Sequence, residues 1–160
     1  MGEVENHESR IKNHESRIMN HELGKDMKFE DWVVEVASQI QQEVSWKFFG
    51  YRKALFLYDL CWQDCEVLLK NPLGKAIASQ LIRSAGSISA NIEEGYGRGF
   101  GKERAYFLRV ALGSARESKG WYYRARFLLS LEVLNHRLNL LDEVIALLMT
   151  ELKNAPTQHT

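Results

Sequence analysis

The stretch ANIEEGYGRGFGKERA, residues 90–105, decides between two folds, because a glycine stands at every second position in its middle. The four glycines are Gly95, Gly97, Gly99 and Gly101. A phosphate-binding glycine loop follows an apolar strand and opens a helix, so that backbone N–H groups converge on the anion. Here the glycines follow a helical pattern, and no Gly-Lys-Ser/Thr ending is present. The run therefore predicts a turn between two helices, with Gly95 ending the first of them as a C-terminal cap.

The sequence on both sides of this turn has the apolar periodicity of helices. The predicted helices span residues 29–44, 46–69, 73–94, 100–129 and 131–153. Asn71 and Pro72 have the residue types of a helix cap and a first helical position. No segment has the pattern of a strand. The predicted fold class is all-α: an antiparallel up-down four-helix bundle over residues 29–155 with an additional N-terminal helix.

The first and fourth bundle helices carry a second row of apolar residues, although a helix of a lone bundle needs one apolar face. On the first helix the second row consists of Ala54, Leu57, Cys61 and Leu68. On the fourth helix it consists of Val133, Leu140, Val144 and Leu147. Two explanations remain open: burial against other subunits, or coverage by the N-terminal helix.

Composition and length favour a single globular domain. The chain has 160 residues, of which 45% are hydrophobic and 26% charged, with a formal net charge of zero. No apolar run approaches the ~20 residues that span a bilayer, and the N-terminus has no apolar signal segment, so we expect a cytoplasmic protein without membrane contact. Cys61 and Cys65 are predicted to be buried free thiols, and no metal or other cofactor is expected.

Residues 1–28 form a leader with the seven-residue repeat NHESRIK, NHESRIM. One strong apolar residue per repeat is too few for a coiled coil. Its histidines, His7, His14 and His21, would stand ~10 Å apart along a helix, too far to share a metal ion. The leader is predicted to be frayed or disordered.

Positive charge is concentrated in residues 98–126, which hold eight Lys and Arg against two acids. Lys102, Arg109 and Arg116 are seven residues apart, so they form one stripe along the third bundle helix. Lys119 and Arg124 flank this stripe, and Tyr123 extends it. Basic side chains with an interleaved aromatic can hold phosphates and stack bases, whereas the alternative is an ordinary solvated face. For Tyr123 and Phe127, a subunit interface is preferred over base stacking.

The sequence does not predict an enzyme. Asn91 and Glu94 lie near the glycine turn, within reach of Arg98 and Lys102, and a buried Glu–Arg pair would fix the geometry of the turn. Glu94 has no second carboxylate or histidine on a matching face, and no Ser–His or Cys–His arrangement is visible. We therefore predict structural roles for these residues near the turn. The predicted structural residues are Asn91, Glu94, Gly95 and Gly113.

The segment QLIRSAGSISANIEEGYGRGFGKERAYFLRVALGSARES, residues 80–118, resembles the four-helix-bundle proteins encoded in intervening sequences of bacterial 23S rRNA genes. The matching features are the Arg83-Ser84-Ala85 run, SISANIEEG at 87–95, Arg98, and ALGSARES at 111–118. The likeness extends over about residues 46–152. The same family includes the accessory variability protein of diversity-generating retroelements.

This resemblance implies a pentameric barrel of bundles whose basic surface contacts nucleic acid and a reverse transcriptase. Two functions of different classes follow. The first is a non-enzymatic oligomer that binds structured RNA or DNA through Arg98 and the stripe on the third helix. The second is a scaffold that binds a protein partner, such as a reverse transcriptase, through apolar helix faces.

Overall fold

The computed structural model describes residues 27–155, and these residues are all-helical, without a strand. The predicted leader, residues 1–28, lies outside this range except for its last two residues. The described chain begins with the short helices α2 (Phe29–Val33), α3 (Ser38–Gln41) and η1 (Val44–Lys47). The long helices are α4 (Phe49–Leu68), α5 (Pro72–Gly97), α6 (Lys102–Arg124) and α7 (Leu131–Asn154), with η2 (Ala125–Phe127) between the last two. The prediction of an all-α chain is thus confirmed for residues 27–155.

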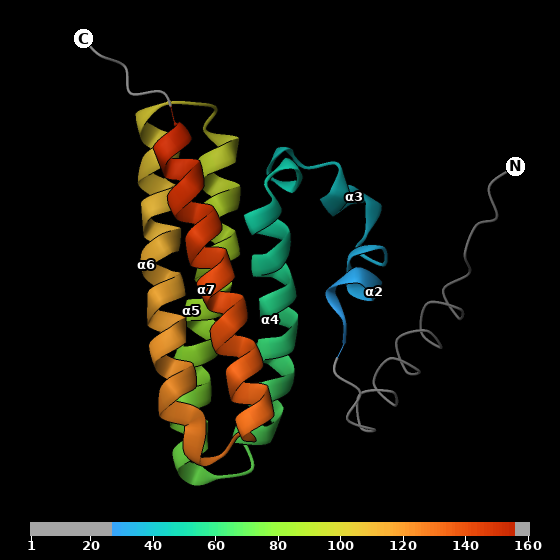
Figure 1. Ribbon diagram of the computed structural model, residues 1–160, viewed down its shortest axis with the longest axis vertical. Coiled ribbons are helices and arrows are strands. Elements are labelled where there is room, and N and C mark those ends of the chain that lie inside the picture. The colour runs from blue at the N-terminus through green and yellow to red at the C-terminus, as the bar shows by residue number, and fades with distance from the viewer. Residues whose placement is uncertain (1–26, 156–160) are drawn as a thin grey trace, which may run out of the picture.

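The four long helices lie side by side, as Figure 1 shows. Each packs against the next in the chain, and α7 also packs against α4, which closes the arrangement. The upper end of Figure 1 gathers η1, the start of α4, the α5–α6 turn and the end of α7. None of the helices in residues 27–155 has both the length and the hydropathy that a bilayer span requires.

Local sequence explains where the long helices begin. The Asn71 side chain accepts hydrogen bonds from the backbone N–H of Leu73 at 2.9 Å and of Gly74 at 3.3 Å, and Pro72 occupies the first position of α5. The hydroxyl of Ser130 accepts a hydrogen bond from Val133 N–H at 3.2 Å and caps α7. These contacts satisfy N–H groups that the first turn of a helix leaves without partners. The cap predicted at Asn71-Pro72 is confirmed.

The glycine run forms a turn between α5 and α6, but it begins later than predicted. Gly95 is a buried residue inside α5, and the helix continues to Gly97. The predicted C-terminal cap at Gly95 is therefore wrong. Only Gly99 and Gly101 adopt positive φ, at 87° and 85°. The helix passes through Gly95 because its missing side chain allows α6 to approach: an added Cβ would lie 3.1 Å from Phe107 Cβ and 3.2 Å from the Arg104 carbonyl oxygen.

The additional N-terminal helix predicted over residues 29–44 is broken into short pieces. A straight helix of this length would be about 24 Å long. The Phe29 ring, however, lies 5.6 Å from the Phe49 ring and 5.5 Å from the Phe56 ring, so the chain must fold back to reach the start of α4. The Trp32 indole adds a hydrogen bond to the Asp59 carboxylate at 2.7 Å. The packing of Phe29 and Trp32 on α4 thus prevents the single helix that the amphipathic pattern of residues 29–44 predicts.

The second apolar row of α4 is buried in the core of the chain, and the docked N-terminal segment covers Phe56 beside it. Phe29 and Trp32 both pack on Phe56, which is buried. Ala54, Leu57, Cys61 and Leu68 are completely buried within the chain. On α7, the middle of the second row, Leu140 and Val144, is also buried. These rows therefore need no second subunit to cover them. Cys61 and Cys65 are buried free thiols, as predicted.

Candidate nucleic-acid interface

One face of α6 presents the predicted basic stripe to solvent. Lys102, Arg109 and Arg116 are exposed. The opposite side of the helix consists of Ala111, Ala115 and Tyr122, which are 0% exposed. The orientation of the stripe was thus predicted correctly, because the 3.6-residue period separates the apolar face from the basic one.

The charges of this stripe are poorly neutralised by the protein itself. Lys102 and Arg109 form no hydrogen bond or ion pair with any residue in the described part of the chain. Arg116 has one weak contact, from its guanidinium to the Met149 sulfur at 3.8 Å. An exposed cation without an internal partner remains available to an external anion.

The residues predicted to flank the stripe are already engaged. Lys119 pairs with Asp142 of α7 at 2.5 Å, and the Arg124 guanidinium carbon lies 4.8 Å from the centre of the Trp121 ring. Arg98 pairs with Glu94 at 2.7 Å, and this hydrogen bond raises the pKa of the guanidinium further above its ordinary value. Lys119 and Arg98, each paired with a carboxylate, therefore add less positive potential to this surface than Lys102, Arg109 and Arg116 do.

The Glu94–Arg98 pair exists, but it is not the buried pair that was predicted. The two side chains are 47% and 49% exposed, and both belong to the end of α5. A pair within one helix end, in contact with water, contributes little stability and cannot fix the angle between α5 and α6.

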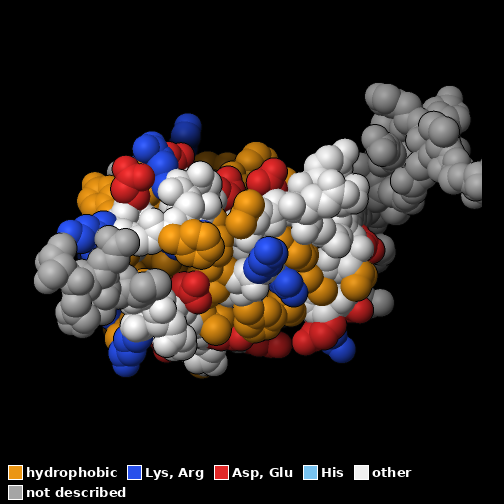
Figure 2. All heavy atoms as spheres, turned by 90° about the horizontal axis from the view of Figure 1, so that it is seen from above, with side chains coloured by type: hydrophobic (Ala, Val, Ile, Leu, Met, Phe, Trp, Pro, Cys, Tyr) orange, Lys and Arg blue, Asp and Glu red, His pale blue; other side chains and the backbone are white. Residues whose placement is uncertain are grey.

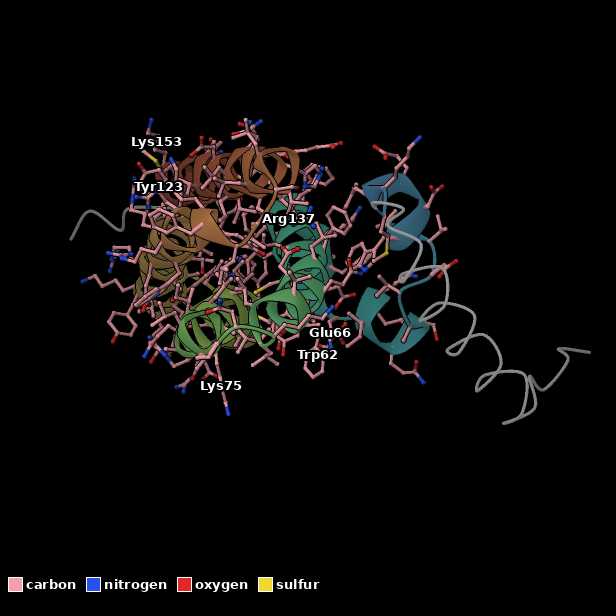
Figure 3. All side chains as sticks on the ribbon, turned by 90° about the horizontal axis from the view of Figure 1, so that it is seen from below. Trp62, Glu66, Lys75, Tyr123, Arg137 and Lys153 are labelled. Carbon is pink, nitrogen blue, oxygen red and sulfur yellow. The ribbon has the colours of Figure 1, made fainter. Side chains whose placement is uncertain are left out.

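An open groove of about 370 Å³ runs between α6 and α7 at the lower part of the stripe. Its lining residues are Arg116, Lys119, Gly120, Tyr123 and Leu138. Tyr123 is 56% exposed, and the Arg126 guanidinium carbon lies 4.3 Å from the centre of its ring. Figure 3 shows Tyr123 at the periphery of the helices, away from the core. The groove thus combines positive charge with an exposed aromatic ring, the two elements that single-stranded nucleic acid requires.

A polar seam, rather than the predicted pair, joins α5 to α6. The Asn91 side chain donates to the Ser87 carbonyl oxygen at 2.7 Å and to the Ser87 hydroxyl at 2.9 Å. Ser114 donates to Ser87 and Ser118 donates to Ser84, each at 2.9 Å. The side-chain partner of Asn91 is therefore Ser87 and not Arg98 or Lys102.

Gly113 does not contribute to the packing of the helices. It is exposed on α6 between Arg109 and Arg116, and an added Cβ would meet no atom within 4 Å. Gly95 thus allows the close approach of α5 and α6, whereas Gly113 leaves a gap in the side chains of the basic face.

The sequence analysis missed a buried ionic cluster that joins three helices. Arg137 of α7 donates to both carboxylate oxygens of Asp64 of α4, at 2.7 and 3.1 Å. The Tyr122 hydroxyl of α6 donates to the same carboxylate at 2.7 Å. Figure 3 shows Arg137 reaching from α7 into the space beside α4, whereas Trp62 and Glu66 point outward. A signal was present: Arg137 lies three residues after Leu134 and four before Leu141, within the apolar face of its helix.

These features define a class: a small all-helical protein with one exposed basic helix face. The chain belongs to the 23S rRNA-intervening sequence protein family, whose model matches residues 51–150, more than half of the chain. The resemblance recognised in residues 80–118 is thereby confirmed.

A related crystal structure shows the same fold. It is that of a protein with unknown function from the S23 ribosomal protein family of Bacteroides thetaiotaomicron, with a TM-score of 0.61 and 23% sequence identity. The match covers 66% of this chain and 99% of that chain. A search of curated proteins found no match.

Proposed function

We propose that this chain is a non-enzymatic, antiparallel four-helix bundle of the cytoplasm that binds structured RNA or DNA through the exposed face of α6. The observation that carries the proposal is the presence of Lys102, Arg109 and Arg116 on one helix face with almost no internal neutralisation. Each of these cations can contact one backbone phosphate and release its counterions, which is the main source of affinity in nucleic-acid binding.

The groove beside the stripe supports the same proposal. Arg116 and Tyr123 line it together, so a phosphate and an unstacked base of one strand have adjacent positions on the protein. Gly113 leaves the surface between Arg109 and Arg116 flat, which allows a sugar-phosphate backbone to approach the helix closely. The name of the family refers to rRNA genes, and the name of the related protein to a ribosomal family, and both agree with an RNA ligand.

The test is the double variant Arg109→Glu/Arg116→Glu in a titration of a fluorescent RNA hairpin at several salt concentrations. The dissociation constant should rise at least about tenfold, and the slope of log affinity against log salt should fall by about 2. The thermal midpoint should be unchanged, because both side chains are exposed.

Lys70→Glu/Lys75→Glu is the matched control. It changes the net charge equally, and both lysines are exposed at the α4–α5 end, where Figure 3 shows Lys75 pointing away from Tyr123. If this control weakens binding as much as the α6 double variant does, the α6 face is not the binding site. Binding that does not depend on salt also contradicts the proposal.

The second candidate is a protein-interaction scaffold, such as an accessory subunit of a reverse transcriptase. It is favoured by exposed apolar residues where α6 is followed by α7: Phe127 is 79% exposed and Leu131 is 72% exposed. Such a surface commonly marks a protein interface. Affinity for a protein partner through it would be insensitive to salt, in contrast to binding by the basic stripe.

We also propose that the chain forms a homo-oligomer, which the family resemblance predicts to be a pentamer. A ring would repeat the α6 face and multiply a weak attraction for nucleic acid through avidity. Light scattering after gel filtration should give a mass that is a multiple of 18.5 kDa, five times that of the chain for a pentamer. A monomer mass at micromolar protein would contradict this part of the proposal, while leaving the α6 face itself untouched.

A further inference from the structure

The Arg104 side chain occupies an unusual position at the end of the helices where α5 turns into α6. Its guanidinium carbon lies 4.1 Å from the centre of the Tyr96 ring and 4.2 Å from that of the Phe100 ring. Stacking against aromatic rings uses the flat faces of a guanidinium group. The N–H donors of Arg104 therefore point outward in the plane of the guanidinium group, along its edge.

One donor on this edge has no partner in the described part of the chain. The Nε atom of Arg104 is buried and has no hydrogen-bond partner among residues 27–155. The carboxylate of Glu151 lies in the same hollow, but it accepts a hydrogen bond from the Tyr96 hydroxyl at 2.8 Å. Burial raises the pKa of the Tyr96 hydroxyl, and the hydrogen bond to Glu151 and its negative charge raise it further. The hydroxyl therefore keeps its proton and donates a hydrogen bond to that carboxylate. Buried polar atoms without a hydrogen-bond partner are rare in proteins, and a buried donor such as this one lacks an acceptor.

A hollow of about 420 Å³ has Arg104 among its lining residues. Its walls come from η1, α4, α5, α6 and α7, and the space is of the size that binds small molecules. Figure 2 looks onto this end from above and shows Lys and Arg side chains among hydrophobic ones. The ring of Phe48 forms part of the wall and stacks on Tyr96, with centroids 6.0 Å apart and planes at 9°.

Gly50 fixes the position of the Phe48 ring. A Cβ at residue 50 would lie 2.3 Å from Phe48 Cζ, so the ring rests directly on the glycine backbone.

The charges in the hollow favour an anion. Lys47 is exposed at its rim and forms no ion pair with the described residues, and Arg104 supplies a second positive charge. The facing acid is Glu151, which is held by Tyr96. Apolar atoms of Phe49 and Leu147 complete the lining.

We propose that this hollow is a binding site for a small organic oxyanion, a carboxylate or a phosphate ester. The oxyanion accepts hydrogen bonds from the Arg104 guanidinium, a group that binds such anions with two parallel N–H donors. The Lys47 ammonium group adds a second charge, and the apolar body of the ligand packs on Phe49 and Leu147. The site is separate from the α6 stripe and does not rest on the nucleic-acid proposal.

Four probes test the site at constant ionic strength: inorganic phosphate, phenyl phosphate, acetate and benzoate. The readouts are calorimetry and the NMR signal of the Arg104 Nε–H, assigned by its loss in Arg104→Lys. We expect saturable binding that shifts this signal, and tighter binding of the two aromatic probes than of the two small ones. Comparing phosphate with acetate, and phenyl phosphate with benzoate, shows whether the site binds phosphate esters or carboxylates more tightly.

Arg104→Lys retains the charge but loses the planar fork, so it should weaken the best probe by about tenfold or more. If this variant does not fold, the exposed Lys47→Gln change still should weaken binding severalfold. The control Lys75→Gln removes an exposed charge far from the hollow and should bind the probes as the original chain does. The proposal is overturned if no probe shifts the Nε–H signal at millimolar concentration, or if Arg104→Lys and Lys47→Gln bind unchanged.

Discussion

Replacement of Arg137 by Met is expected to lower the free energy of unfolding by about 3–5 kcal/mol, because it leaves the Asp64 carboxylate buried without its counter-charge. Arg137 and Asp64 are 2% and 5% exposed, and two hydrogen bonds join them. After the substitution, the carboxylate would retain the hydrogen bond that the Tyr122 hydroxyl donates to it at 2.7 Å. Burial raises the pKa of that hydroxyl, so Tyr122 remains a neutral donor that cannot supply the missing positive charge. Urea unfolding followed by circular dichroism measures the effect.

A matched triple variant separates the loss of one partner from the removal of the whole cluster. Asp64→Leu/Tyr122→Phe/Arg137→Met replaces every polar atom of the cluster with an apolar group of similar size. Because a buried pair recovers little more than its desolvation cost, this variant should be far less destabilised than Arg137→Met alone. If the single and triple variants lose the same stability, the cluster acts through shape and not through charge.

The second large effect is expected at Gly74, at the start of α5. An added Cβ would lie 2.2 Å from the Leu68 carbonyl oxygen and 2.7 Å from Leu128 Cδ1. The Leu68 carbonyl belongs to the end of α4 and accepts a hydrogen bond from Asn71 N–H at 3.1 Å, so it cannot move freely. Gly74→Ala should therefore lower the free energy of unfolding by about 3 kcal/mol through overpacking.

Gly113→Ala is the matched control for Gly74→Ala. The substitution is chemically identical and also lies within a long helix, but no atom is within 4 Å of the added Cβ. It should raise the stability by about 0.5–1 kcal/mol, because alanine has the higher helix propensity. Equal effects at the two positions in the same unfolding experiment would show that propensity decides both and that the contact with Leu68 does not matter.

The exposed face of α6 was predictable because it depends on one helix alone. Once residues 102–124 are helical, the seven-residue spacing of Lys102, Arg109 and Arg116 places them on one side. The apolar residues on the other side then decide which face turns to water. The pairing of Lys119 with Asp142 could not be predicted in the same way, because it depends on the register of α7 against α6.

The hollow lined by Arg104 also could not be predicted from the sequence. Its parts come from positions as distant as Lys47 and Glu151, and only the convergence of five helical segments brings them together. The sequence placed Arg104 within the basic segment 98–126, whereas the structure turns it away from the stripe and against Tyr96 and Phe100.

The sequence by itself determined that the chain is helical, approximately where the long helices begin and end, and which face of each is apolar. These properties follow from hydrophobic periodicity and capping, which act within a few residues. The tertiary structure alone decided that residues 29–47 break into short helices, that Gly95 lies inside α5, and that Asp64 meets Arg137. Each of these depends on the close approach of segments far apart in the chain, where the free energy of packing and of burying charge exceeds local preference.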